Sequence, residues 1–453
     1  MVVNWALTLG MEVVIASSSI DAGIGCWELQ SGGEQLRYKS CVSPSHGLTS
    51  VGHRFLASSQ ITSSSSGSVL YWSWSKPHVE VRSFPAEPIR PLISNSQGTY
   101  IIGGGISGHI YFWEVTTGRL LKKWHAHYRG VTCLALSDDD SLLISGAEDG
   151  HVRVWSLFMI FDDVRREEAR HLYEHSFSEH TLRVNDVVVG YGGCNAIVVS
   201  ASEDRTCKVW SLSTGKLLRN IVFPTIIDAI ALDPGEHVFY AGSRDGKIFI
   251  AALNVDCSSS SSYGMHIIGL LSDQSKAVTC LAFGLDGVTL ISGSEDGMIR
   301  VWDTMTHNIT RIFRHSKGPV NNILVVKQPD SFNSQVPSTK RRGSLIVPPL
   351  DKYLDSTDES KHVEAVIAYQ ETCNTPLDPS YISFHVMMNH IKEFQKQDSS
   401  AATEMDVERL KLECKRSVQM VNEWKKLYEN LHQFCVNELL DGVQSGGTNG
   451  YCS

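Results

Sequence analysis

Serine, histidine and aspartate recur together at fixed spacing in this chain, and they are the residue types of a hydrolytic triad. In the clearest copy, Asp149 follows Ser145 by four residues and Trp155 follows Asp149 by six, with His127 upstream. The recurring sets are His127, Ser145, Asp149 and Trp155; His180, Ser200, Asp204 and Trp210; and Ser292, Asp296 and Trp302. An active site occurs once, whereas this pattern repeats, and no G-x-S-x-G sequence accompanies it. We therefore interpret each set as a buried hydrogen-bond network that holds one structural repeat together, and we expect no catalytic residue.

The elements that position these residues are predicted to be β-hairpins. A short apolar run, an acidic turn and an alternating strand that ends in Trp are typical of a hairpin, and a period of roughly 40 residues is typical of a β-propeller. The terminal positions of the repeats are Trp27, Trp72, Trp113, Trp155, Trp210, Ala251 and Trp302. Ser66 and Ser107 replace the turn Asp in the second and third repeats, and we expect blade stacking to tolerate such losses. The predicted fold is an all-β, seven-bladed propeller over residues 1–326.

Two features of the ring are less regular. Closure should pair strands from both ends of the chain, and either Val2–Leu9 or the run 319–326 could form the junction. Residues 158–179 contain a mixed-charge run of helical composition, and we expect this insertion to stand out from the ring as a solvated helix or a partner contact. The serine run Ser258–Ser262 is expected to be a flexible loop tip.

The remaining residues are predicted to form three segments. Residues 327–377 read as an irregular linker with a short β-run at Val363–Tyr369. The run Lys340–Ser344 is by default a solvated loop, with a kinase site at Ser344 or a nuclear-import patch as alternatives. Residues 378–441 form a helical, coiled-coil-like extension, and residues 442–453 a disordered tail.

The extension contains one long amphipathic helix at about 402–440. Its apolar side includes Leu410, Val421, Trp424, Tyr428, Leu431 and Phe434. This stripe could lie back on the propeller, pair with itself or pair with another subunit. We favour intermolecular packing, because a closed propeller exposes little apolar surface.

Net charge, cysteine spacing and the absence of known motifs argue against several functional classes. The net charge of −9 over 453 residues argues against a surface built throughout for nucleic acid, although a local basic face stays open and direct RNA contact is undecided. The 11 cysteines form no C-x-x-C pair, so we expect reduced thiols and no metal. No G-x4-G-K-[ST] sequence occurs, and no cofactor is predicted. No signal peptide or membrane span is visible.

The repeats resemble the WD-repeat family over residues 1–326, with Trp302-Asp303 as the one full Trp-Asp dipeptide. The whole layout is similar to the plant ROOT INITIATION DEFECTIVE proteins, which resemble the WD-repeat subunit of the complex that matures large ribosomal subunit precursors. That similarity rests on the opening Glu12–Trp27, the charged insertion and the C-terminal helix.

The resemblance implies a non-catalytic scaffold of the nucleus, nucleolus and nucleoplasm that supports pre-rRNA processing. The implied partners are an α-solenoid protein, a remodelling ATPase and the ribosome precursor particle, and the C-terminal helix would be the assembly element. An adaptor for a ubiquitin ligase or for a transcription or chromatin complex is the alternative.

Overall fold

The structure of the protein is a computed structural model. It describes residues 12–20, 23–52, 54–63, 66–162, 171–253, 266–315, 318–328 and 347–354. All of them belong to the compact unit Met1–Gln370. The six stripe residues of the expected C-terminal helix, the β-run at Val363–Tyr369, the run Lys340–Ser344 and the tail 442–453 lie outside the described residues.

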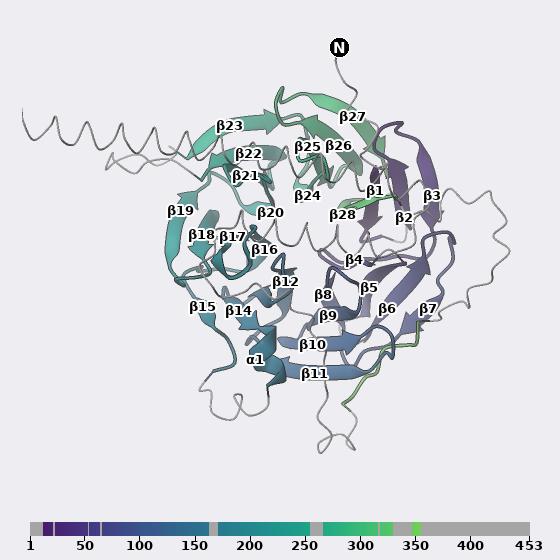
Figure 1. The fold of residues 1–453 in the computed structure, drawn as a ribbon. Helices are drawn as coiled ribbons and strands as arrows, with labels where there is room; N and C mark the ends of the chain where they lie inside the picture. The colour runs from purple at the N-terminus through teal and green to yellow at the C-terminus, as the bar shows by residue number, and fades with distance from the viewer. Residues whose placement is uncertain are drawn as a thin grey trace, which may run out of the picture. The chain divides into compact units, whose positions relative to one another are not determined.

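Seven four-stranded antiparallel sheets surround one axis, which confirms the seven-bladed propeller (Figure 1). We number the blades along the chain and give their strands from the innermost to the outermost. Blade 1 holds β28 (Val320–Lys327), β1 (Glu12–Ser18), β2 (Ile24–Glu28) and β3 (Glu34–Tyr38). Blade 2 holds β4 (Leu48–Val51), β5 (Phe55–Ser63), β6 (Ser66–Ser73) and β7 (Val81–Ser83). Blade 3 holds β8 (Ile89–Ser94), β9 (Tyr100–Gly105), β10 (His109–Glu114) and β11 (Leu120–His125).

The other four blades repeat this order. Blade 4 holds β12 (Val131–Leu136), β13 (Leu142–Ala147), β14 (Val152–Ser156) and β15 (His175–Phe177). Blade 5 holds β16 (Val184–Val189), β17 (Ile197–Ser202), β18 (Thr206–Ser211) and β19 (Leu217–Val222). Blade 6 holds β20 (Ile227–Leu232), β21 (Val238–Ser243), β22 (Lys247–Ala252) and β23 (Ile267–Ser272). Blade 7 holds β24 (Val278–Phe283), β25 (Thr289–Ser294), β26 (Met298–Asp303) and β27 (Ile309–Arg314).

The ring closes through β28, which pairs antiparallel with β1. In Figure 1 the green β28 lies beside the purple β1, although nearly the whole ring separates them in sequence. The Asn322 side-chain amide donates to Ser17 Oγ at 3.0 Å and to the carbonyl oxygen of Pro44 at 2.8 Å. Of the two candidate junctions, the run 319–326 therefore supplies the innermost strand of blade 1. Val2–Leu9 lies outside the described residues.

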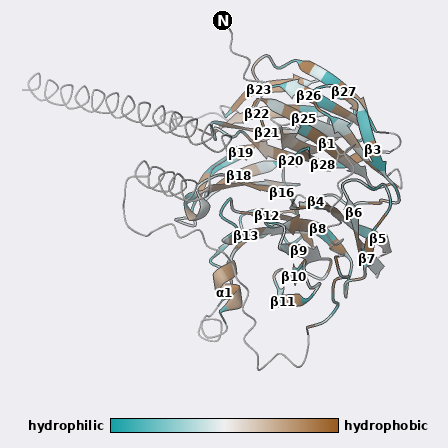
Figure 2. Ribbon diagram, turned by 45° about the vertical axis from the view of Figure 1, so that its right-hand side comes forward, coloured by the Kyte–Doolittle hydropathy of each residue, from teal (hydrophilic) through white to brown (hydrophobic). Residues whose placement is uncertain are grey.

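The core consists of apolar clusters that join neighbouring blades. One cluster, for example, joins Val69 and Tyr71 of blade 2 to Tyr111 and Trp113 of blade 3. Period-two alternation makes this possible, because each strand turns one set of side chains to the preceding blade and the other set to the next. The outer strands carry more polar residues, as the teal of β3 and β27 in Figure 2 shows. Burial of apolar area between blades is thus the main stabilising contribution.

The insertion after Trp155 is partly built into the ring, so the expectation that residues 158–179 stand out from it is wrong for two parts. The short helix α1 (Leu157–Phe161) buries Leu157 and Ile160 against blade 3. β15 then pairs with β14 as the outer strand of blade 4. The physical reason is that an unpaired β14 would expose its backbone groups. Residues 163–170 and Ser258–Ser262 lie outside the described residues.

A segment of the expected linker, residues 347–354, is irregular but packed on the propeller; we call it the strap. Val347 and Leu350 are buried in the cluster that joins blades 2 and 3. The Leu350 amide donates to Ser83 Oγ at 2.9 Å, and the Asp351 amide donates to the carbonyl of Gly118 at 2.8 Å. In Figure 1 the strap is the green trace near β7 and β11. Among the described residues, no helix is long and apolar enough to cross a membrane.

Candidate functional site

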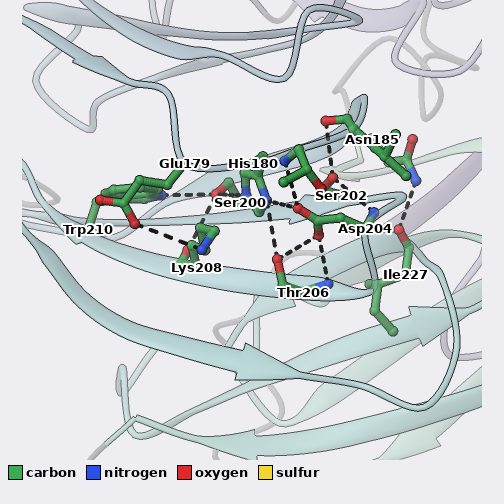
Figure 3. A network of polar contacts seen from close by, with 12 residues as sticks. Glu179, His180, Asn185, Ser200, Ser202, Asp204, Thr206, Lys208, Trp210 and Ile227 are labelled. Atoms are coloured by element: carbon green, nitrogen blue, oxygen red, sulfur yellow. Dashed lines mark hydrogen bonds and ion pairs between the residues drawn. The ribbon is translucent and has the colours of Figure 1, made fainter.

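Blade 5 contains the most complete polar network, which Figure 3 shows from close by. The Trp210 indole N–H donates to Ser200 Oγ at 3.0 Å, and His180 Nε2 lies 2.9 Å from the same hydroxyl. His180 Nδ1 lies 2.9 Å from Asp204 Oδ2. Thr206 completes the set, because its hydroxyl donates to Asp204 Oδ1 at 2.6 Å. The structure thus brings together all four predicted residues of this repeat.

The hydrogen bonds of this network run in one direction. Nδ1 of His180 faces a carboxylate, so the proton is assigned to Nδ1, and Nε2 accepts from Ser200. Burial alone would raise the pKa of the Asp204 carboxyl, but hydrogen bonds from His180 and Thr206 outweigh it and hold the pKa well below its usual value. The ionised carboxylate of Asp204 accepts from His180 and from Thr206, and these hydrogen bonds fix the hairpin turn against the loop that carries His180.

Blade 4 repeats the arrangement with a longer His–Asp distance. His127 Nε2 lies 2.7 Å from Ser145 Oγ, and Trp155 donates to that oxygen at 2.8 Å. His127 Nδ1 lies 3.4 Å from Asp149 Oδ2. Burial lowers the pKa of His127, and the His127 contact together with backbone N–H groups lowers the pKa of Asp149 against the effect of its own burial. The histidine is therefore neutral and the aspartate ionised.

Blade 7 keeps the serine and the tryptophan but uses a glutamine in place of the histidine. Trp302 donates to Ser292 Oγ at 2.8 Å, and Gln274 Nε2 donates to it at 2.6 Å. Asp296 pairs instead with Arg300, whose Nη1 lies 3.0 Å from Asp296 Oδ2. Gln274 was missed in the sequence, although it stands four residues before Val278, just as His180 stands four residues before Val184.

In blade 3, residues from outside the repeat replace two partners of the network. Ser107 occupies the turn position of the aspartate, and its amide and hydroxyl donate to the Glu87 carboxylate at 2.8 and 2.6 Å. The position that corresponds to Ser145 is Gly103, so the Trp113 indole has no serine partner. It donates instead to the carbonyl oxygen of Asp351 in the strap, at 2.9 Å.

Blade 6 replaces the polar network with apolar packing. Ala241 and Ala251 occupy the positions of Ser200 and Trp210, as the β21–β22 register shows. Phe223 occupies the position of His180, and its ring centroid lies 5.5 Å from that of Phe249 and 6.5 Å from that of Phe239. Apolar packing thus replaces the His, Ser and Trp positions of the network. The turn aspartate is kept, and Asp245 accepts hydrogen bonds from Ser243 Oγ and from the Lys247 amide.

These networks are not arranged for hydrolysis. The serine side chains of the three repeats are fully buried, and each hydroxyl already accepts a hydrogen bond from a tryptophan. A nucleophile must reach a substrate carbonyl, and these hydroxyls cannot. Within the described part of the chain, no group of three or more His, Cys, Asp or Glu side chains could hold a metal ion. The geometry supports a structural role and leaves the loops and the outer edges of the blades for binding.

Comparison with known proteins identifies the repeats. The family model described as "WD domain, G-beta repeat" matches residues 118–156, 172–211 and 265–303, the three repeats that keep Ser, Asp and Trp. The chain is 54% identical to Protein ROOT INITIATION DEFECTIVE 3 of Arabidopsis thaliana over 97% of this chain and 100% of that protein. It is 31% identical to human WD repeat-containing protein 18 over 78% and 81% of the two chains. It is 25% identical to Pre-rRNA-processing protein IPI3 of Yarrowia lipolytica over 73% and 80%.

Proposed function

This chain belongs to the WD-repeat protein family that includes ROOT INITIATION DEFECTIVE 3 and WD repeat-containing protein 18, and we propose that it is a non-catalytic scaffold supporting pre-rRNA processing. The observation that carries the proposal is similarity along most of the chain to a relative whose name states a role in pre-rRNA processing. The similarity extends well beyond the three repeats that match the family model, so it is not a likeness between isolated WD repeats.

The polar side chains of the blade networks hydrogen-bond within the protein, which agrees with the role of a scaffold. The His, Ser and Asp side chains of blades 4 and 5 are engaged with each other and with backbone N–H groups. Catalysis needs such groups at a surface that a substrate can reach. The propeller therefore offers its loops and outer edges to protein partners, as a rigid support does.

The finer parts of the proposal concern location and partners. We place the protein in the nucleus, nucleolus and nucleoplasm, where ribosome precursors are assembled. Its partners would be an α-solenoid protein, a remodelling ATPase and the precursor of the large ribosomal subunit. The expected helix at 402–440 would be the assembly element, because its apolar stripe needs a partner to cover it.

Affinity purification tests the function. The tagged protein from nuclear extract is expected to enrich rRNA precursors that retain internal transcribed spacers, relative to mature rRNA and to a tag-only control. Depletion of the protein should cause the same precursors to accumulate on a northern blot. Ubiquitin ligase subunits or histones in place of rRNA precursors would refute the proposal and favour an adaptor of the other kind.

Light scattering tests the assembly element. The full chain is expected to have a mass above that of the monomer, whereas a chain that ends after residue 397 should be monomeric. If both proteins are monomers, the helix does not drive self-association. Its role would then be limited to another subunit of the same complex.

A further inference from the structure

Blades 3 and 4 carry a continuous series of aromatic and cationic side chains beside their network turns, which we call the belt. The belt consists of His109, Lys123, His125, Tyr128, Arg153 and Tyr173. These residues come from β10, β11, the loop before β12, β14 and the segment before β15. The fold assembles them, because His109, the run from Lys123 to Tyr128, Arg153 and Tyr173 are separate in sequence.

Ring contacts connect every member of the belt except Lys123, whose ammonium lies 5.1 Å from the ring centroid of Tyr111 beside it. The rings of His109 and His125 meet edge to face with centroids 5.2 Å apart, and the His125 and Tyr128 centroids are 6.1 Å apart. The Arg153 guanidinium lies between two tyrosines, 5.9 Å from the Tyr128 ring centroid and 5.0 Å from that of Tyr173. His171 extends the series by stacking on Tyr173 at 5.0 Å.

The belt is held in place from beneath. The Tyr128 amide donates to Asp149 Oδ2 at 3.1 Å, so the network of blade 4 fixes the backbone of this loop. Arg153 is tied down by hydrogen bonds to the carbonyl of Ala126 and to Ser176 Oγ. The Tyr128 side chain is nevertheless 78% exposed. A large aromatic ring on a fixed backbone, facing water, is a surface prepared for stacking.

The exposed cationic side chains at the belt favour an anionic partner. Lys123 and Arg129 are exposed, and Arg153 is half-buried, on a chain whose net charge is −9. Two nearby carboxylates are engaged beneath the surface: Glu87 accepts from Ser107 and Tyr111, and Asp149 accepts from backbone N–H groups. Glu87 and Asp149 keep their charge but are mostly covered, so the exposed charges at the belt are two cations, Lys123 and Arg129, and one acid, Glu174.

We propose that the belt binds single-stranded RNA, with bases stacked on its rings and phosphates against its cations. Unpaired bases stack on Tyr, His and Arg planes, and such sites combine aromatic rings with positive charge. The inference rests on the proposed function for the source of the strand, which is pre-rRNA. A duplex is a poor fit, because its bases are already stacked within the helix and cannot lie on the rings.

Fluorescence anisotropy with the purified full-length chain tests the belt. The probe is a labelled single-stranded oligouridine, with the oligouridine–oligoadenine duplex as the comparison. Tyr128→Ala is expected to weaken binding about tenfold, the usual size for one stacked base. Lys123→Ala should reduce the steepness of the salt dependence by about 0.7 in log–log slope, which corresponds to one phosphate contact. Glu174→Gln should tighten binding.

Matched controls keep the test specific. Tyr191→Ala removes an aromatic side chain that is 61% exposed on blade 5, and Arg314→Ala removes an exposed cation on blade 7; neither should change RNA affinity. Thermal unfolding of every variant shows that the fold is kept. Equal RNA affinity of Tyr128→Ala and Tyr191→Ala would overturn the proposal. So would a wild-type protein that fails to bind RNA.

The outcomes separate this inference from the proposed function. A wild-type protein that ignores RNA but still enriches rRNA precursors from extract refutes the belt and keeps the scaffold. If Tyr128→Ala then loses a protein from the purified complex, the belt is a protein interface. RNA binding that depends on the belt, without precursor enrichment in cells, supports the belt and refutes the scaffold proposal.

Discussion

Asp204→Asn is expected to destabilise the propeller, and the geometry of blade 5 sets the size of the effect. Two donors reach each carboxylate oxygen of Asp204: Thr206 N and Oγ1 reach Oδ1, and His180 Nδ1 and Thr181 N reach Oδ2. An asparagine keeps one carbonyl oxygen and presents an NH₂ group at the other position. Two N–H donors then face a donor, so their hydrogen bonds are lost.

Hydrogen bonds to a charged group contribute about 1.5 to 3 kcal/mol each, so the loss of two would cost about 3 to 6 kcal/mol. The imidazole of His180 can exchange its tautomer and accept from the new amide, which recovers part of this loss. We expect a decrease of about 3 kcal/mol in the free energy of unfolding. Asp149→Asn should cost about half as much, because His127 Nδ1 is already 3.4 Å from its carboxylate.

Urea unfolding at neutral pH measures the change as a shift of the midpoint. The hydrogen bonds in the fold hold the pKa of Asp204 below its value in the unfolded chain. Its stabilising contribution is therefore present above the unfolded pKa of about 4, and it is lost as the pH falls below that value. The difference between wild type and Asp204→Asn should shrink in acid. Glu295→Gln, an exposed carboxylate in the corresponding turn of blade 7, is the control and should leave the midpoint unchanged. A wild-type midpoint for Asp204→Asn would refute the view that the network stabilises the blade.

Two further predictions concern the strap and the ring closure. Trp113→Phe keeps the ring packing but removes the donor to the Asp351 carbonyl, so it should lower the free energy of unfolding by about 1 kcal/mol in the full chain. The thermal midpoint of a chain that ends after residue 328 should be much less sensitive to the same change, and equal effects in both chains would contradict the strap's role. Asn322→Ala should destabilise by about 1 to 3 kcal/mol, because Ser17, Ser43 and the Pro44 carbonyl lose their shared donor. Hydrogen exchange of the β1 amides should then quicken before that of β17, whereas uniform exchange in both strands would argue against local opening at the junction.

The sequence predicts the number of blades well, because each repeat carries its own local signal. In blades 3, 4, 5 and 7 a turn residue followed six positions later by Trp marks the β-hairpin whether or not the acid is present. The expected turn position of Ser66 is wrong, because β5 and β6 are longer than predicted and Ser66 is the first residue of β6, paired with Ser63. The closing strand was undecided because Val2–Leu9 and the run 319–326 have similar alternation. β15 was missed because its three residues, His175–Phe177, form a strand only by pairing with β14. Local pattern does not encode pairing with a distant partner.

The spacing of residues in the sequence predicts the polar networks of repeats four and five. It does not predict the groups that replace missing network residues in other blades. Glu87 and Asp351 act in blade 3 from outside the repeat unit, one of them through a backbone carbonyl that has no residue signature. The belt was missed for a related reason. In sequence, Tyr128 stands among basic residues and histidines, whereas Arg153 follows Glu148 and Asp149. Only the fold brings the two segments together and turns the Asp149 carboxylate towards the Tyr128 amide.

The departures in blade 3 are connected and are not independent losses tolerated by the ring. A Cβ at Gly103 would lie 2.8 Å from Ile89 Cγ2 and 3.1 Å from the Trp113 ring, so the serine of the other repeats does not fit there. Without a serine, the Trp113 N–H would be buried and unpaired, at a cost of about 1 to 3 kcal/mol. The strap removes that cost by supplying the Asp351 carbonyl, and Gly118 allows its approach, since a Cβ there would lie 2.4 Å from the Pro349 carbonyl oxygen. In blade 3 the degenerate repeat is therefore completed by a non-repeat segment, the strap, which packs at blades 2 and 3.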